Sequence, residues 1–245
     1  MAIFYVIGTP IGNLEDITLR ALRVLKEVDV VLCEDTRVTH NLLKKYDIHT
    51  KTLSYHAQSG LAKVNEIMEL IEDGKNLALV SDAGTPGVSD PGSVLVSKIV
   101  ERFGDDVKIE AIPGPSALTA ALSIAGAPVH EFNFLGFFPH KKGRETLFNE
   151  IFETDRAVVF YESPHRIMKT LESLAAHART ETKTIIVLRE LTKIFEQAVR
   201  GSAREVADYF IKNDDKVRGE FVVIVAPAVA RRTTDESDDQ ISEQE

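Results

Sequence analysis

Cysteine is nearly absent: Cys33 is the only one in 245 residues, and tryptophan is missing altogether. A single cysteine excludes a disulfide within the chain and a thiolate cage for a metal ion, and it is typical of a cytoplasmic protein. Cys33 ends the apolar run 30–33, so we interpret it as a small core side chain rather than a nucleophile. The seven histidines show no ligand-like spacing, and we expect no metal site.

Long apolar runs are also missing. No stretch reaches the ~20 apolar residues of a membrane-spanning helix, so we expect no membrane partner. The apolar residues 2–7 follow no basic segment and end at Gly8, which predicts a first strand rather than an export signal.

Positive charge is in deficit, with a net charge of −9, which at first argues against a nucleic-acid partner. Residues 231–245 hold two arginines and six acidic residues, a net −4, which leaves −5 for the rest. Exposed charges are screened beyond about 8 Å at physiological salt, so a distant tail need not cancel a basic patch. We expect residues 229–245 to be a disordered acidic tail. The net charge alone therefore neither indicates nor excludes a nucleic-acid partner.

Short β-branched runs alternate with helical patterns along the chain. This alternation predicts a mostly parallel sheet covered by helices on both faces. In the first half, strands are predicted at 3–7, 30–32, 77–80 and 107–112, and helices at 17–28, 61–72 and 94–103.

Glycines and prolines interrupt the pattern at residues 126–145, around an aromatic-rich strand, and the pattern then restarts. Short turns in the second half, such as the one before Gly219, predict more antiparallel pairing there. We therefore expect two α/β domains, residues 1–118 and 119–228. In the second, strands are predicted at 157–161, 184–188 and 221–225, and helices from residue 164 and at 203–211.

Four loops follow predicted strand ends, which is where open α/β sheets bind ligands. Glycines in three of them permit close backbone approach to a ligand, although the first lacks the Gly-x-Gly-x-x-Gly pattern of nicotinamide cofactors. Taken singly, each loop also fits an ordinary turn or helix cap. The loops are Gly8-Thr9-Pro10-Ile11-Gly12-Asn13, Ser81-Asp82-Ala83-Gly84-Thr85-Pro86, Pro113-Gly114-Pro115-Ser116-Ala117 and Phe160-Tyr161-Glu162-Ser163-Pro164-His165-Arg166.

Together, in this order, the four loops resemble those of the tetrapyrrole-methylase superfamily, over about residues 4–225. The first loop departs from the Gly-x-Gly-Pro-Gly pattern common in that superfamily. This departure favours the branch that methylates a ribose 2′-oxygen of small-subunit ribosomal RNA over tetrapyrrole substrates. Further matches are Glu34-Asp35-Thr36-Arg37, Arg189-Glu190-Leu191-Thr192-Lys193 and Arg218-Gly219-Glu220.

The resemblance implies a homodimer with a cleft between two α/β domains that holds S-adenosylmethionine. It implies 2′-O-methylation of a cytidine in small-subunit (16S) ribosomal RNA. The alternatives are a tetrapyrrole C-methyltransferase and a non-catalytic RNA-binding assembly factor that has kept the fold. The cofactor contacts carried over by motif are Pro10, Asp82, Gly84, Thr85, Ser116, Ala117, Tyr161 and Glu162.

Methyl transfer to oxygen needs a collinear nucleophile, methyl carbon and sulfur. Such positioning supplies roughly 7–11 kcal/mol of the barrier, and a general base adds about 10²–10⁴-fold. Glu190, Glu34 and His165 are candidate bases, and we assign Glu190 with Lys193 as its electrostatic partner. An ordinary surface pair is the alternative, because Glu190 and Lys193 lie three residues apart.

Contacts to RNA phosphates require cations. The best cluster is Lys141, Lys142 and Arg144, which follow the aromatic stretch 137–140 and so suit an unstacked nucleotide. Arg37 and Arg166 extend this predicted substrate site. A solvated loop whose phenylalanines belong to the core is the alternative interpretation.

Overall fold

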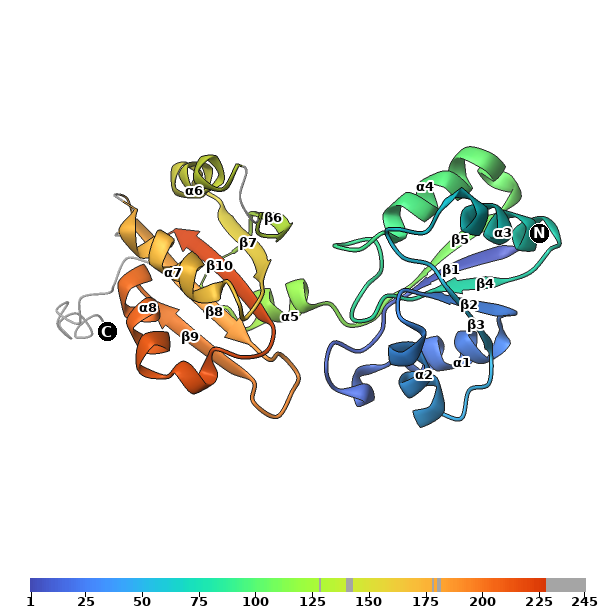
Figure 1. Ribbon diagram of the computed structural model, residues 1–245, viewed down its shortest axis with the longest axis horizontal. Helices are drawn as coiled ribbons and strands as arrows, with labels where there is room; N and C mark the ends of the chain where they lie inside the picture. Colours follow the sequence, from blue (N-terminus) through green and yellow to red (C-terminus); the bar gives the residue numbers. More distant parts are fainter. Residues whose placement is uncertain (128, 140–142, 178, 180–181, 228–245) are drawn as a thin grey trace, which may run out of the picture.

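The computed structural model describes residues 1–127, 129–139, 143–177, 179 and 182–227. Two five-stranded sheets form two lobes along the chain, which confirms the predicted α/β fold with two sheets (Figure 1). The predicted tail at 229–245 and the lysines Lys141 and Lys142 lie outside the described residues. Within the described ranges, no helix is both long enough and apolar enough to cross a membrane.

The first sheet is entirely parallel, in the order β3-β2-β4-β1-β5. Successive strand residues face opposite sides and build two cores, one with Phe4 under α3 and α4, the other with Ile7 and the buried Cys33 under α1 and α2. Its elements are β1 (Ile3–Ile7), α1 (Leu19–Glu27), β2 (Val30–Cys33), α2 (Thr36–Lys45), β3 (Lys51–Ser54), α3 (Leu61–Glu72), β4 (Leu77–Leu79), α4 (Gly92–Phe103) and β5 (Lys108–Ile112).

The second sheet has the order β6-β7-β10-β8-β9 and is antiparallel except between β6 and β7, as the short turns predicted. Helices α6, α7 and α8 cover one face, whereas the other face packs against the short helix α5. The elements are α5 (Ala117–Ser123), β6 (Phe132–Phe137), α6 (Arg144–Glu153), β7 (Ala157–Glu162), α7 (Ile167–Ala176), β8 (Lys183–Arg189), β9 (Gln197–Gly201), α8 (Ala203–Lys212) and β10 (Phe221–Pro227).

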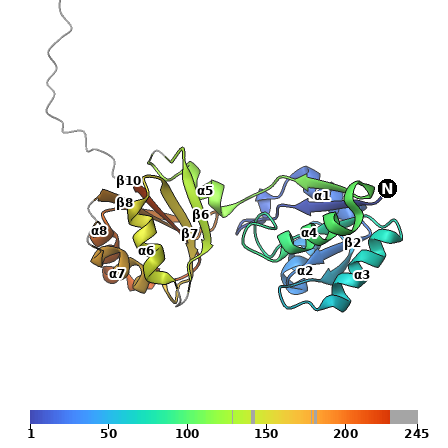
Figure 2. The same cartoon turned by 90° about the horizontal axis from the view of Figure 1, so that it is seen from above.

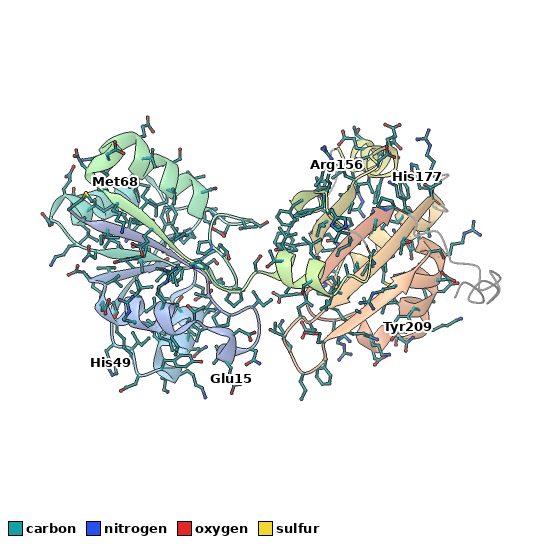
Figure 3. The ribbon with its side chains drawn as sticks, turned by 180° about the vertical axis from the view of Figure 1, so that it is seen from behind. Glu15, His49, Met68, Arg156, His177 and Tyr209 are labelled. Atoms are coloured by element: carbon teal, nitrogen blue, oxygen red, sulfur yellow. The ribbon has the colours of Figure 1, made fainter. Side chains whose placement is uncertain are left out.

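Helix α5 lies where the chain passes from the first lobe to the second (Figure 2). Its alanines and leucines share a core with Ile11 from the first lobe and Leu191 from the second. The predicted domain boundary between residues 118 and 119 falls inside this helix and stays a prediction. The side of the second lobe that carries Tyr209 of α8 and His177 after α7 faces away from the first lobe (Figure 3).

Candidate active site between the two lobes

A cleft of about 430 Å³ is lined by residues of both lobes, and its size suits a small-molecule ligand. The first lobe supplies strand-end loops at the carboxyl edge of its parallel sheet, and the second lobe supplies the ends of β6, β7 and β8 and the start of β10. The lining consists of Ile11, Glu34, residues 81–85 and 88–90, Ser116, Ala117, Phe137, residues 161–164, Leu191 and residues 220–222.

The first three predicted loops are joined by backbone contacts. The Thr9 amide donates to the Gly84 carbonyl at 2.9 Å, and the Gly84 amide donates back to the Thr9 carbonyl at 3.1 Å. The Thr85 hydroxyl donates to the carbonyl of Pro115 at 3.2 Å. Gly8 and Gly114 touch so closely that a Cβ on Gly114 would lie 2.5 Å from the Gly8 oxygen. The three loops therefore form one rigid wall of the cleft.

Asp82 and Asp90 shape the longest of these loops. Asp90 accepts hydrogen bonds from the amides of Gly87 and Gly92, the latter at 2.7 Å at the first residue of α4, and so closes the turn that leads into the helix. Asp82 accepts from the Asp35 amide at 3.0 Å through Oδ1. Its second carboxylate oxygen has no protein partner among the described residues and is available to a ligand in the cleft.

Ser116 precedes α5 but makes no capping hydrogen bond, which leaves its hydroxyl available to a ligand. Every predicted cofactor contact except Pro10 lines the cleft. Pro10 is buried and lines a smaller neighbouring hollow of about 170 Å³, which shares Ser81 and Asp82 with the cleft. The structure thus brings the predicted cofactor residues together, and their contact with a cofactor stays a prediction.

The fourth loop is built around a buried carboxylate. The Glu162 side chain is fully buried and accepts from the Ser163 amide at 2.9 Å, the Thr170 hydroxyl at 2.7 Å and the Arg166 guanidinium at 2.8 Å. Arg166 also donates to the Phe138 carbonyl at 2.7 Å. The helix predicted from residue 164 is present as α7, but its predicted start is three residues too early, because residues 164–166 form a turn and α7 begins at Ile167.

Tyr161 presents its ring to the cleft between two phenylalanines. Its centroid lies 5.0 Å from that of Phe134 and 5.4 Å from that of Phe137, both in edge-on contact. Burial raises the pKa of the Tyr161 hydroxyl above its ordinary value, so the side chain stays neutral at physiological pH.

The predicted catalytic pair lies beside the cleft, outside its lining. Lys193 donates to Glu190 at 2.9 Å and to Glu220 at 2.8 Å, and the Glu190 carboxylate also accepts from the Glu220 amide. Burial raises the pKa of Glu190, but these two hydrogen bonds outweigh burial and leave the pKa below its ordinary value. The Lys193 side chain lies over Gly12, so the pair joins the two lobes. These contacts disfavour Glu190 as a base, and that role stays a prediction.

Glu34 is the only one of the three candidate bases that lines the cleft. It follows β2, and its carboxylate has no hydrogen-bond partner in the part of the chain that the structure describes. Burial raises its pKa above the ordinary value, and the negative charges of Asp82 and Asp90 raise it further, against a smaller opposite effect of His56. A carboxylate with a raised pKa is the better proton acceptor at neutral pH. His165 is exposed and outside the lining.

The predicted RNA-binding cations fall into different surroundings. Arg37 is exposed and pairs with Asp35 at 2.6 Å, next to the cleft wall. Arg144 packs its guanidinium over the rings of Phe138 and Phe148, at 4.9 and 5.1 Å from their centroids, and donates to the Thr170 hydroxyl. Arg144 and the half-buried Arg166 would have to leave these internal partners to reach a phosphate. Their role in substrate binding stays a prediction.

No group of histidine, cysteine and carboxylate side chains within the described ranges is arranged to hold a metal ion. The cleft has polar strand-end loops of the first lobe on one wall and aromatic strand ends of the second lobe on the other.

Comparisons with known proteins agree with this arrangement. The family described as Tetrapyrrole (Corrin/Porphyrin) Methylases matches residues 4–207, and the chain belongs to this family of methyltransferases. Within it, the chain is similar to proteins named ribosomal RNA small subunit methyltransferase I. The relative from Hydrogenobaculum sp. is 43% identical over 91% of this chain and 94% of its own length, and that from Thermotoga maritima is 41% identical over 90% and 96%.

Solved structures share the fold at low sequence identity. The methyltransferase CobJ superposes with a TM-score of 0.67 at 20% identity, covering 95% of this chain and 97% of that one. Diphthine synthase gives a TM-score of 0.68 at 17% identity, covering 92% and 90%. At these identities the likeness establishes the fold and leaves the substrate open.

Proposed function

We propose that this methyltransferase uses S-adenosylmethionine to methylate the 2′-oxygen of a cytidine ribose in small-subunit (16S) ribosomal RNA. The observation that carries the proposal is the cleft itself, because the loops shared with the family converge there from both lobes. Relatives above 40% identity that are named for small-subunit ribosomal RNA favour this acceptor over a tetrapyrrole. Such a substrate also favours the cytoplasm as the location.

The residues of the cleft fit the proposed cofactor. Buried apolar side chains, Ile11, Leu191 and Val222, line its interior, and the free oxygen of Asp82 and hydroxyl of Ser116 can meet polar groups. S-adenosylmethionine supplies a methyl group made electrophilic by its sulfonium. The residues of this chain have to hold the acceptor in line with that group and take up the proton of its hydroxyl.

We propose Glu34 as the proton acceptor in place of Glu190. A ribose hydroxyl in the cleft would meet Glu34 on its wall. The Glu34 carboxylate would take the hydroxyl proton while the methyl carbon passed from the sulfonium sulfur to the ribose oxygen and left a neutral thioether. The Glu190–Lys193–Glu220 cluster serves to fix the strand ends of the second lobe and to bring Lys193 against the first loop. These contacts support a positioning role for Lys193.

Labelled S-adenosylmethionine tests the function directly. We expect the protein to transfer label to small ribosomal subunits from cells that lack it, and mass spectrometry to find the label on a ribose of 16S RNA. Transfer to uroporphyrinogen instead would identify a tetrapyrrole C-methyltransferase. Tight binding of the cofactor without transfer to either acceptor would identify a non-catalytic assembly factor.

We also propose a homodimer, as the resemblance to the family implies. Sedimentation equilibrium should give twice the chain mass of 27.2 kDa.

A further inference from the structure

Strand β6 carries a bulge immediately before it enters the cleft. Phe134 pairs with Val159 of β7 and Phe137 pairs with Tyr161, so three steps along β6 match two steps along β7. Gly136, inside the bulge, has φ of +64°, a left-handed conformation that glycine adopts without strain. Bulges of this kind change the direction in which the following side chain points.

The extra residue places two phenylalanines on the same side of the sheet. In a regular strand, residues three apart face opposite sides. Here the rings of Phe134 and Phe137 both contact the Tyr161 ring, at 5.0 and 5.4 Å. Phe134 is half-buried against the core beneath α5, whereas Phe137 lines the cleft and is 59% exposed.

Burial in the core does not account for the position of Phe137. The next residue, Phe138, is 1% exposed and packs in the core under α6. Gly136 lies beside Ser89 of the first lobe, since a Cβ on Gly136 would be 3.1 Å from the Ser89 hydroxyl. Val88, next to Ser89, is also exposed and lines the cleft. The two lobes thus present exposed apolar side chains to the same cleft.

We propose that the Phe137 ring is the platform on which the base of the target nucleotide stacks, an inference that rests on the proposed function. A ribose oxygen can reach the cleft only when its nucleotide leaves the stack of neighbouring bases, and an aromatic ring replaces the lost stacking. The interior apolar wall of Ile11, Leu191 and Val222 is buried and suits the cofactor, whereas Phe137 is open to an incoming substrate.

The test compares Phe137→Ala and Phe137→Tyr with a matched control, Phe195→Ala. Phe195 is a similarly exposed phenylalanine of the same lobe that does not line the cleft. Methyl transfer to small ribosomal subunits gives kcat/KM, and calorimetry gives the Kd of S-adenosylmethionine. We expect Phe137→Ala to lower kcat/KM about 5- to 150-fold, the range of one base–aromatic stack, with the cofactor Kd unchanged. Phe137→Tyr and Phe195→Ala are expected to stay near wild type.

Three results would overturn the inference. The first is wild-type kcat/KM in Phe137→Ala, and the second is an equal loss in Phe195→Ala. The third is a cofactor Kd that weakens as much as kcat/KM falls, because the ring would then stack on the cofactor's adenine. These results leave the proposed function standing. A wild-type protein that transfers no methyl group to the subunits would instead overturn the proposed function and the inference with it.

Discussion

Glu34 and Glu190 differ in what surrounds their carboxylates. Glu34 faces the cleft beside Asp82 and Asp90, without a cation bound to it in the described part of the chain. Glu190 holds Lys193 at 2.9 Å and lies outside the cleft lining. Both are glutamates next to strand ends in the sequence. Only the structure shows that the Glu34 carboxylate is free whereas that of Glu190 is neutralised by Lys193.

Replacing Glu34 with glutamine should therefore remove the proton acceptor. We expect kcat to fall about 10²- to 10⁴-fold with the cofactor Kd unchanged, measured by single-turnover methyl transfer and calorimetry. The control Glu190→Gln should keep kcat within about tenfold, since it loses only a positioning contact. The opposite ranking of the two variants would restore Glu190 as the base.

The pH dependence of kcat gives an independent check on Glu34. The acceptor must be deprotonated, so wild-type kcat should fall as the pH drops through the pKa of Glu34. Burial and the charges of Asp82 and Asp90 raise that pKa above 4.5, while His56 opposes them. We expect the acid limb to lie above 4.5 in the wild type and to vanish in Glu34→Gln. A limb that persists in the variant would belong to another group.

Two features require glycine at position 219: its own backbone conformation and the close approach of the Glu190 side chain. Its φ is +84°, and an added Cβ would lie 2.2 Å from Glu190 Oε1. Gly74, at φ +77°, has nothing within 4 Å and is the matched control. Gly219→Ala should lower the free energy of unfolding, measured in urea, by about 1–3 kcal/mol more than Gly74→Ala. The added methyl group must displace the Glu190 carboxylate at position 219, whereas it meets no atom at position 74. Equal losses would show that the backbone alone matters.

At the scale of elements, sequence patterns located four of the five strands of the first sheet and the loops that follow them, since buried parallel strands are short continuous apolar runs. They did not reveal α2, β3, α6 and β9. The edge strand β9 is half-buried, and polar and apolar residues alternate little along it. Helix α6 does place Phe148, Ile151 and Phe152 at helical spacing, but the adjacent glycines and prolines obscured it.

The turn before α7 depends on the pair of Glu162 and Arg166, whose side chains are 0% and 17% exposed. Arg166→Met keeps the packing volume but leaves a buried carboxylate without its cation, which should lower the free energy of unfolding by about 3–5 kcal/mol. The control Arg23→Met breaks an exposed pair, Arg23 with Glu27, and should cost about 0–1 kcal/mol. Similar losses in urea unfolding would mean that the buried pair adds nothing beyond a surface one.

At the scale of the whole molecule, the motifs indicated which loops share a site, because strand ends of a parallel sheet meet at one edge. They could not indicate which of the predicted side chains would be bound to other residues of the protein and so be unavailable to a ligand. Arg144 and Arg166, predicted to contact RNA, are bound to Thr170 and Glu162. Phe137 and Phe138, adjacent in sequence, face the cleft and the core respectively. These differences arise from the bulge and the buried pair, which no local pattern specifies.

A ligand held by both lobes should stabilise the chain as a unit. S-adenosylmethionine at 100 times its Kd should raise the free energy of unfolding by about 2.7 kcal/mol, provided it binds only the folded state. Thermal unfolding followed separately by probes in each lobe should then show both transitions moving together. A shift confined to the first lobe would mean that β7, β8 and β10 take no part in binding.

The contact between Gly8 and Gly114 leaves no space for even one methyl group on either residue. Any substitution there would force β1 and β5 apart at the carboxyl edge of the sheet, beside the cleft. This part of the first lobe consequently tolerates little change, and the opposite wall of the cleft is the place to alter selectivity for the acceptor. Engineering this protein to methylate a different acceptor should therefore begin at the end of β6. A side chain there can change size without disturbing the proposed binding site of the methyl donor.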